Sequence, residues 1–322
     1  MSTASFQQRL SLENNGFWRY AELLDNISAE FQIPSLQQNP TPLEKIDSFW
    51  LKREDLSPTH SHKFRSLIYQ LSLLKSKGVK QAVLSSSGNA AISASYYAKA
   101  AGVKLFTFLS DKTPPEKLAA IKIENIIPII SSKPLRLAKY AIAHFGFPDL
   151  RPSQDANAIE GFQTLGFELF EQNPNIENIF SFATSFASLR GIQKAYEKLL
   201  SFNEIKHTPK LYAVMNEGVL AGELSGQSSR QRVDKRVDNF EIVHSTDEEI
   251  LSTRKEFLST ELSTQISNES VASIAAFRQI KPKGKSVVIS TGCLYPSRQP
   301  DLTQFKVAET FADVDKIVAK YG

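Results

Sequence analysis

Lys63 is the residue of this sequence whose type and surroundings first suggest covalent chemistry. It follows a polar stretch that contains His60 and His62, and it precedes the apolar residues of a predicted helix. A lysine partly withdrawn from water has a lowered pKa, and its neutral amine is a nucleophile toward carbonyl groups. Most lysines at the start of a helix are solvated, however, so a surface role is the alternative interpretation of this residue by itself.

Three other turns carry polar residues directly after a predicted strand, at residues 86–89, 184–188 and 291–293. Ligands of open α/β sheets bind beyond the carboxyl ends of the strands, and a helix N-terminus there attracts anions. Asn89 suits such a site, but asparagine is also a common helix N-cap residue, which is its structural interpretation. The turn at residues 291–293 by itself indicates only a change of chain direction after a buried strand.

The elements that must position these turns alternate along the chain. Short apolar runs predict strands, and apolar residues at helical spacing between them predict helices. The predicted strands are residues 48–52, 81–84, 104–109, 126–130, 179–183, 211–215 and 287–290. The predicted helices are centred on residues 67–74, 90–98, 161–170, 189–199, 246–258, 271–275 and 311–317. Thr246 and Glu249 have the spacing of a capping box. This order predicts an α/β fold with mostly parallel sheets covered by helices on both faces.

Length and composition limit the class of protein. The 322 residues suffice for two domains, at about 150 residues each. A hydrophobic content of 41% with 22% charged residues is typical of a globular chain and excludes collagen and coiled coil. The net charge of +4 supports neither a nucleic-acid nor a membrane partner. His144, His207 and His244 have no metal-ligand spacing, so we expect no metal site.

The sequence also carries indications of compartment. No apolar run approaches the roughly 18 residues of a membrane span, and the polar residues 1–12 lack the apolar core of a signal peptide. Cys293 is the one cysteine and cannot form an intrachain disulfide. We therefore expect a cytoplasmic protein. Residues 222–238, rich in Ser, Gln, Arg and Gly without periodicity, are expected to form a surface loop.

Four segments carry a resemblance to a known family. They read NPTPL at 39–43, LKREDLSPTHSHK at 51–63, SSGNAA at 86–91 and EGFQTLGFE at 160–168. In this order they resemble the fold-type-II pyridoxal-phosphate enzymes, the superfamily of threonine synthase, serine/threonine dehydratase, cysteine synthase and the tryptophan synthase β-chain. The likeness is closest to threonine synthase, whose KREDLNPTGSFK stretch ends in the cofactor lysine and whose EGQKTIAFE helix resembles the fourth segment.

The resemblance implies a fold. It implies an α/β chain of two domains, each with a mostly parallel twisted sheet flanked by helices, with the cofactor in the cleft. Residues 45–147 would form the smaller domain, which carries the lysine and the Ser/Asn turn. Residues 1–44 and 148–322 would form the larger domain, which carries the phosphate loop. Relatives of this fold are commonly dimers, so a homodimer is expected.

The resemblance also implies roles for single residues. Lys63 would form the Schiff base with pyridoxal 5'-phosphate and would then be the general base at the substrate Cα. Asn89 would hydrogen-bond the ring hydroxyl of the cofactor, and Thr291, or alternatively Ser290, would face its pyridine nitrogen. A neutral hydroxyl there fits elimination and replacement chemistry better than transamination. The carboxylate of a small amino-acid substrate would be held by Ser86, Ser87 and Gly88.

The phosphate loop is where the sequence departs most from the family. The family has a glycine-rich turn such as GSGGTLAGI, whereas residues 184–192 read TSFASLRGI. Backbone N–H groups and hydroxyls of the loop would cradle the cofactor phosphate at a helix start. Glycine provides a positive φ or a close backbone approach there, and we expect neither from Phe186. His60 likewise replaces a usual glycine. The loop residues assigned to the cofactor are Thr184, Ser185, Phe186, Ala187 and Ser188.

Three functions follow from this resemblance. The first is a threonine-synthase-like lyase that converts O-phosphohomoserine to threonine and phosphate by γ-elimination and β-addition of water. The second is a serine/threonine dehydratase-like β-elimination that gives a 2-oxo acid and ammonia. The third is a degenerate homologue that binds the cofactor or a partner without turnover, which the altered phosphate loop motivates. The motifs favour the first.

Overall fold

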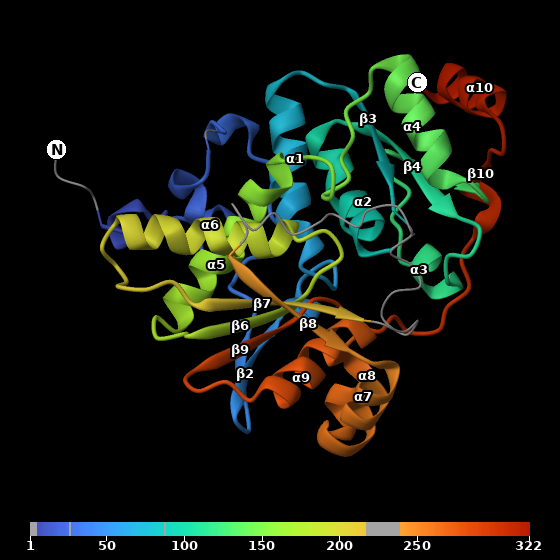
Figure 1. Cartoon of the computed structure of the whole chain (residues 1–322). Coiled ribbons are helices and arrows are strands. Elements are labelled where there is room, and N and C mark those ends of the chain that lie inside the picture. The colour runs from blue at the N-terminus through green and yellow to red at the C-terminus, as the bar shows by residue number, and fades with distance from the viewer. Residues whose placement is uncertain (1–4, 26, 87, 217–238) are drawn as a thin grey trace. The chain divides into compact units, whose positions relative to one another are not determined.

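The computed structural model describes residues 5–25, 27–86, 88–216 and 239–322. Ser87 and the surface loop expected at 222–238 lie outside these residues. The chain forms two compact units, and Figure 1 labels most of their helices and strands. The first unit comprises Met1–Asn26, Ser35–Arg65 and Ala158–Leu294, and the second comprises Ile27–Pro34, Ser66–Asn157 and Tyr295–Gly322. These bounds differ from the predicted division at 45–147, because Lys63 belongs to the first unit and the C-terminal segment to the second.

A six-stranded sheet in the order β1-β2-β9-β6-β7-β8 forms the centre of the first unit. The pair β1–β2 is antiparallel, and the other neighbouring strands pair in parallel. This mostly parallel sheet confirms the predicted fold class. The strands are β1 (Leu43–Ile46), β2 (Phe49–Arg53), β6 (Asn178–Phe182), β7 (Lys210–Asn216), β8 (Phe240–Ser245) and β9 (Ser286–Ser290).

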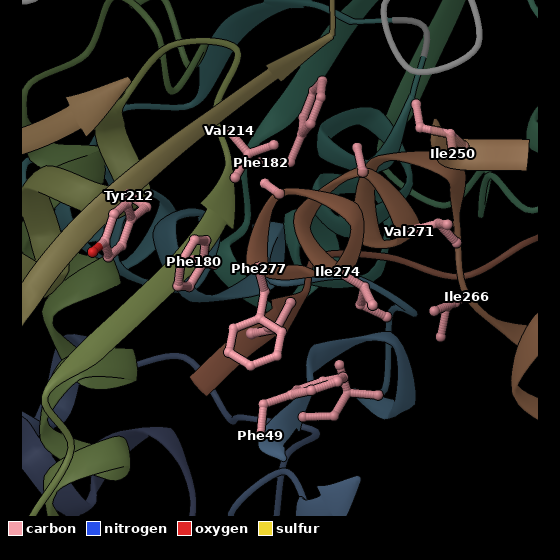
Figure 2. Packing of buried hydrophobic residues seen from close by; sticks show 14 of the residues in the cluster. Phe49, Phe180, Phe182, Tyr212, Val214, Ile250, Ile266, Val271, Ile274 and Phe277 are labelled. Carbon is pink, nitrogen blue, oxygen red and sulfur yellow. The ribbon is translucent and has the colours of Figure 1, made fainter. Parts of the chain in front are cut away.

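Helices cover both faces of this sheet. Figure 1 shows α5 (Asn157–Gln172) and α6 (Ala187–Ser201) on one face and α9 (Asn268–Ile280) on the other. In the core of Figure 2, Phe277 of α9 packs against the rings of Phe49 and Phe180, with centroids 4.9 and 5.7 Å away. The smaller helical elements of this unit are α7 (Asp247–Ser252), a π-helical turn (Thr253–Phe257), α8 (Thr260–Gln265) and 3-10 turns at Gln7–Arg9, Phe17–Leu23 and Glu54–Leu56.

The second unit contains a four-stranded parallel sheet in the order β10-β5-β4-β3. Its core joins Val83 and Phe106 of the sheet to Leu137 of α4 and Val314 of α10. The C-terminal segment therefore completes this unit through one strand and one helix. The strands are β3 (Gln81–Ser85), β4 (Lys104–Ser110), β5 (Ile126–Ser131) and β10 (Lys306–Val307). The helices are α2 (Asn89–Ala101), α3 (Pro115–Ala119), α4 (Pro134–Phe145), α10 (Phe311–Tyr321), 3-10 turns at Ala29–Phe31 and Leu302–Gln304, and α1 (Lys63–Ser76), which starts in the first unit.

Two glycines let α5 and α6 approach each other closely. A Cβ atom on Gly191 would lie 2.8 Å from the carbonyl oxygen of Ile159, and one on Gly166 would lie 2.6 Å from the Cβ of Ala195. Neither distance is tolerated in a close-packed interior, so this helix spacing requires glycine. The approach brings the first residue of α6 against the side chain of Phe162.

We expect Gly191→Ala to destabilise the protein. Alanine normally stabilises a helix interior by roughly 0.5–1 kcal/mol relative to glycine, but here the methyl group would overlap the backbone of α5, and overpacking costs about 1–3 kcal/mol. Urea unfolding followed by circular dichroism measures the free energy of unfolding. Glu197→Ala, at an exposed position of the same helix, is the control and should have little effect. A stabilised Gly191→Ala protein would contradict the close approach.

Candidate functional site

Lys63 is the first residue of α1 and is half-buried. Its Nζ lies 5.7 Å from the centroid of the Phe162 ring. The loss of solvent lowers the pKa of Lys63 to about 8, against the opposing effect of the Glu269 carboxylate. A substantial fraction of this amine is therefore neutral near pH 8, and the neutral amine is the form that reacts with a carbonyl group.

The turn before Lys63 pairs with the turn that follows β9. The backbone N–H of His62 donates to the carbonyl oxygen of Thr291 at 3.1 Å, and the ring Nδ1 of His62 lies 2.8 Å from the same oxygen. A carbonyl oxygen only accepts, so Nδ1 carries the proton of the neutral ring. Burial, followed by the nearby charge of Lys63, lowers the pKa of His62 to about 3 and keeps the ring uncharged. Thr291 is thus held next to the lysine turn by two hydrogen bonds to one residue.

Side chains of α9 hold the same turn from another direction. The hydroxyl of Ser270 donates to the carbonyl oxygen of Gly292 at 3.2 Å. The hydroxyl of Ser290, the alternative partner for the pyridine nitrogen, donates to Ser270 at 3.2 Å. Thr291 and Ser290 are both buried, which excludes competing water from this end of β9.

The predicted phosphate loop leads into α6. Phe186 is the N-cap residue of that helix, with φ +58° and ψ −3°, and its side chain is buried. The expectation that phenylalanine would not take a positive φ is therefore wrong. Placing a residue other than glycine in this conformation costs about 1–3 kcal/mol of folding free energy, so its surroundings must hold it there.

The other loop residues differ in exposure. Ser185 and Ser188 are buried and Thr184 is exposed. The first N–H groups of an α-helix have no partner within it and favour an anion.

Phe162 of α5 lies beside both the lysine turn and the phosphate loop. Its ring lies 5.4 Å from the ring of His62 as well as close to Lys63, and its side chain packs with Ala187 at the start of α6. Two of the four predicted turns therefore meet at one aromatic ring within the first unit, and the turn at Thr291 is joined to the first of them through His62. Sequence reasoning missed Phe162 because a phenylalanine inside a helical motif is ordinarily a core residue.

The fourth predicted turn lies in the second unit, at the start of α2. Gly88 is the N-cap residue and Asn89 is the first residue of the helix, so the interpretation of Asn89 as the N-cap is wrong. The Oδ1 of Asn89 accepts a hydrogen bond from the hydroxyl of Tyr295 at 3.2 Å. Tyr295 was not identified from the sequence, because nothing in its local sequence marks it as a partner. The backbone N–H of Gly88 donates to Ser86 Oγ at 3.4 Å.

A buried network of four charges anchors the start of α1. Arg65 follows Lys63 by two residues and donates to both carboxylate oxygens of Glu54, at 2.8 and 2.7 Å. It also donates to Glu168 of α5 at 2.9 Å, and Lys52 of β2 donates to the same carboxylate. The four side chains are almost completely inaccessible to solvent. Two cations and two anions balance, which is how ionised groups are accommodated in an interior.

Thr41 connects this network to the N-terminal part of the unit. Its backbone N–H donates to Glu168 at 2.9 Å and its hydroxyl donates to Glu54 at 2.6 Å. Burial by itself would raise the pKa of Glu168, but the charges of Arg65 and Lys52 outweigh burial and lower the pKa to about 2. Glu168 is therefore ionised wherever the protein is folded at ordinary pH. The sequence motifs contain all of these residues, but their spacing along the chain did not indicate that they meet.

Two further observations concern metals and membranes. Among the described residues, no group of three or more His, Cys, Asp or Glu side chains is arranged to hold a metal ion. In the same part of the chain, no helix has both the length and the apolar character needed to cross a bilayer.

The chemistry around Phe162 is that of an amine, buried hydroxyls and a helix N-terminus, which suits a carbonyl compound that carries an anionic group.

Loss of one charge from the buried network should destabilise the fold. Glu168→Gln would leave Lys52 and Arg65 with one carboxylate between them, at a cost of about 3–5 kcal/mol. The stability that the ionised Glu168 contributes is present above pH 4.5 and is lost as the pH falls toward 2. Urea unfolding between pH 7 and pH 3 should therefore show a smaller acid sensitivity in Glu168→Gln than in the wild type. Glu124→Gln, which removes an exposed ion pair with Lys99, is the control and should match the wild type. Equal acid sensitivity of Glu168→Gln and wild type would argue against this ionisation.

Lys63 should react at lower pH than an ordinary lysine. Competitive acetylation at pH 6–11, read by peptide mass spectrometry, should give a midpoint near pH 8 for Lys63, because its amine loses its proton there. Solvent-exposed lysines titrate near 10.4 and serve as internal controls in the same digest. A midpoint for Lys63 at or above that of the exposed lysines would show that burial does not lower its pKa.

Curated proteins with sequence similarity act on threonine or produce it, as their names state. A threonine synthase of Methanocaldococcus jannaschii is 24% identical over 232 residues, which are 66% of this chain and 56% of that protein. An L-threonine dehydratase of Mycobacterium leprae is 31% identical over 149 residues, which are 41% of this chain and 35% of that protein. The matches therefore span from about a third to just over half of the length of these relatives.

Solved structures support the same fold. A serine racemase from Dictyostelium discoideum superposes with a TM-score of 0.64 and 21% identity, over 80% of this chain and 94% of that chain. The family described as pyridoxal-phosphate dependent enzyme matches residues 34–292, which is most of the chain. This match confirms the resemblance and the predicted cofactor. The chain belongs to the family of pyridoxal-phosphate dependent enzymes.

Proposed function

We propose that this chain is an enzyme that holds pyridoxal phosphate on Lys63 and acts on a small amino acid. The observation that carries the proposal is the half-buried amine of Lys63, with its pKa lowered to about 8, beside Phe162. Phe162 also packs against the start of α6. An amine for the aldehyde and a helix N-terminus for the phosphate therefore lie around one ring, and these residues fit the cofactor.

At such a site, different residues of the chain bind the phosphate, face the ring nitrogen and accept the proton. The N–H groups at the start of α6, with Ser185 and Ser188, bind the phosphate, and Thr291 faces the ring nitrogen. When bound, the cofactor withdraws electron density from the amino-acid Cα and makes its proton acidic. Lys63 takes that proton, because its lowered pKa leaves a substantial fraction of the amine unprotonated near pH 8.

The substrate carboxylate is assigned to the turn before α2. Ser86, Ser87 and Gly88 precede this 13-residue helix, and Asn89 begins it. The N-terminal end of a helix favours a negative charge. We infer that this turn orients the amino acid and that Asn89 contacts the cofactor hydroxyl. Both assignments rest on the family resemblance of the SSGNAA segment.

We place the reaction of threonine synthase first. The threonine synthase relative matches 66% of this chain, which is more than the dehydratase relative matches. In this reaction phosphate leaves Cγ of O-phosphohomoserine and water adds at Cβ to give threonine. The second candidate is threonine dehydration to 2-oxobutyrate and ammonia, which the 31% identity to a threonine dehydratase supports. A homologue without turnover, a homodimer and a cytoplasmic location stay predictions.

The test of the proposed cofactor site is spectroscopic. Wild-type protein reconstituted with pyridoxal phosphate should absorb visible light, and borohydride should bleach that band and fix the cofactor to the peptide that contains Lys63. Lys63→Ala should lose the band, because no other amine is held beside Phe162 by the contacts described. Lys75→Ala, in the last turn of the same helix, should keep it. A wild-type protein that takes up no cofactor would reject the proposal.

The reaction is tested on the reconstituted protein. Phosphate released from O-phosphohomoserine with formation of threonine would support the first candidate, and 2-oxobutyrate formed from threonine would support the second. Lys63→Ala is the control in both assays and should abolish either product. A protein that holds the cofactor on Lys63 and yields neither product would reject both candidates and favour the homologue without turnover.

A further inference from the structure

The left-handed residue of the phosphate loop carries a side chain that is itself held in place. The ring of Phe186 lies 5.3 Å from the ring of Phe240 at the start of β8, with an angle of 26° between the two planes. Phe186 is 3% exposed, and Phe240 is half-buried. The two rings are far apart in the sequence and belong to the same unit.

A second contact fixes the next residue of the loop. The side chain of Ala187 packs with Ala158 and Phe162 of α5. Three loop residues stand where the family has glycine. The side chains of Phe186 and Ala187 are packed against neighbouring elements, one on β8 and one on α5, whereas Thr184 is exposed. The first hydrogen bond of α6 forms from the N–H of Arg190 to the carbonyl oxygen of Phe186 at 2.9 Å, so the helix begins at this residue.

We propose that Phe240 is a positioning residue for the cofactor phosphate. Its ring holds Phe186 in the left-handed conformation, and this conformation aims the N–H groups at the start of α6 toward the phosphate. Glycine adopts a positive φ without help, whereas phenylalanine requires a contact that opposes the strain. The inference rests on the proposed function of the loop and extends it to a residue outside the loop.

Phosphate recognition should depend on Phe240 only while residue 186 is not glycine. Four proteins test this dependence: wild type, Phe240→Ala, Phe186→Gly and the double variant. Their dissociation constants for pyridoxal phosphate are measured by absorbance titration. Phe240→Ala should raise the constant about tenfold in the wild-type background. In the Phe186→Gly background the same substitution should change it less than twofold, because glycine keeps the turn without the ring.

A second ligand separates the phosphate contact from general damage to the fold. Pyridoxal has the ring and the aldehyde but lacks the phosphate, so its affinity should be the same in wild type and Phe240→Ala. Phe277→Ala removes an aromatic contact in the core on the other face of the sheet and is the control for lost stability. It should leave both affinities unchanged in the folded protein. Phe240→Leu replaces Phe240→Ala if the latter does not fold.

The possible outcomes have distinct meanings. A weaker affinity for pyridoxal phosphate alone, abolished in the glycine background, supports the role of Phe240. An equal loss for pyridoxal and pyridoxal phosphate, or the same loss in both backgrounds, overturns it while the cofactor function stands. A wild-type protein that binds no pyridoxal phosphate overturns the inference together with the proposed function.

Discussion

The balanced charge network of Lys52, Glu54, Arg65 and Glu168 is the constraint on which the first unit depends. Four ionised side chains without solvent are stable only when each is paired and hydrogen-bonded, so their positions cannot relax independently. The network joins β2, the first turn of α1 and the middle of α5. Arg65 lies two residues after Lys63 in the same helical turn. The contacts that hold Arg65 in the network therefore also fix the backbone position of Lys63.

The environment of Lys63 follows from this anchoring. With the start of α1 fixed against α5, Phe162 lies beside the amine, and its ring reaches both His62 and the start of α6. The glycine contacts between α5 and α6 bring the phosphate loop into the same neighbourhood. His60 and Phe186 both take a φ of +58° where the family has glycine. The strain at Phe186 is opposed by ring packing, and the backbone of His60 is held by hydrogen bonds to Ser57 and Cys293.

Much of the fold could be predicted from local patterns. All seven predicted strands exist, because the short buried strands of a parallel sheet consist of consecutive apolar residues. Thr246 and Glu249 form the predicted capping box. The strands β1, β8 and β10 were missed. The first two are polar and partly exposed, and β10 has only two residues. The helix N-cap, which was the alternative interpretation of Asn89, is instead Gly88, because helix boundaries are poorly fixed by local sequence to within a residue.

The sequence by itself determined the fold class, the family and the candidate residues, because periodicity and motif spacing are properties of the chain alone. Only the tertiary structure decided how those residues are held. The ring of Phe186 packs against a ring in β8, and the lowered pKa of Lys63 depends on the atoms that exclude water from it. The hydrogen bond between Tyr295 and Asn89 likewise joins distant segments. Contacts of this kind arise from packing between elements, and no local pattern of residue types records them.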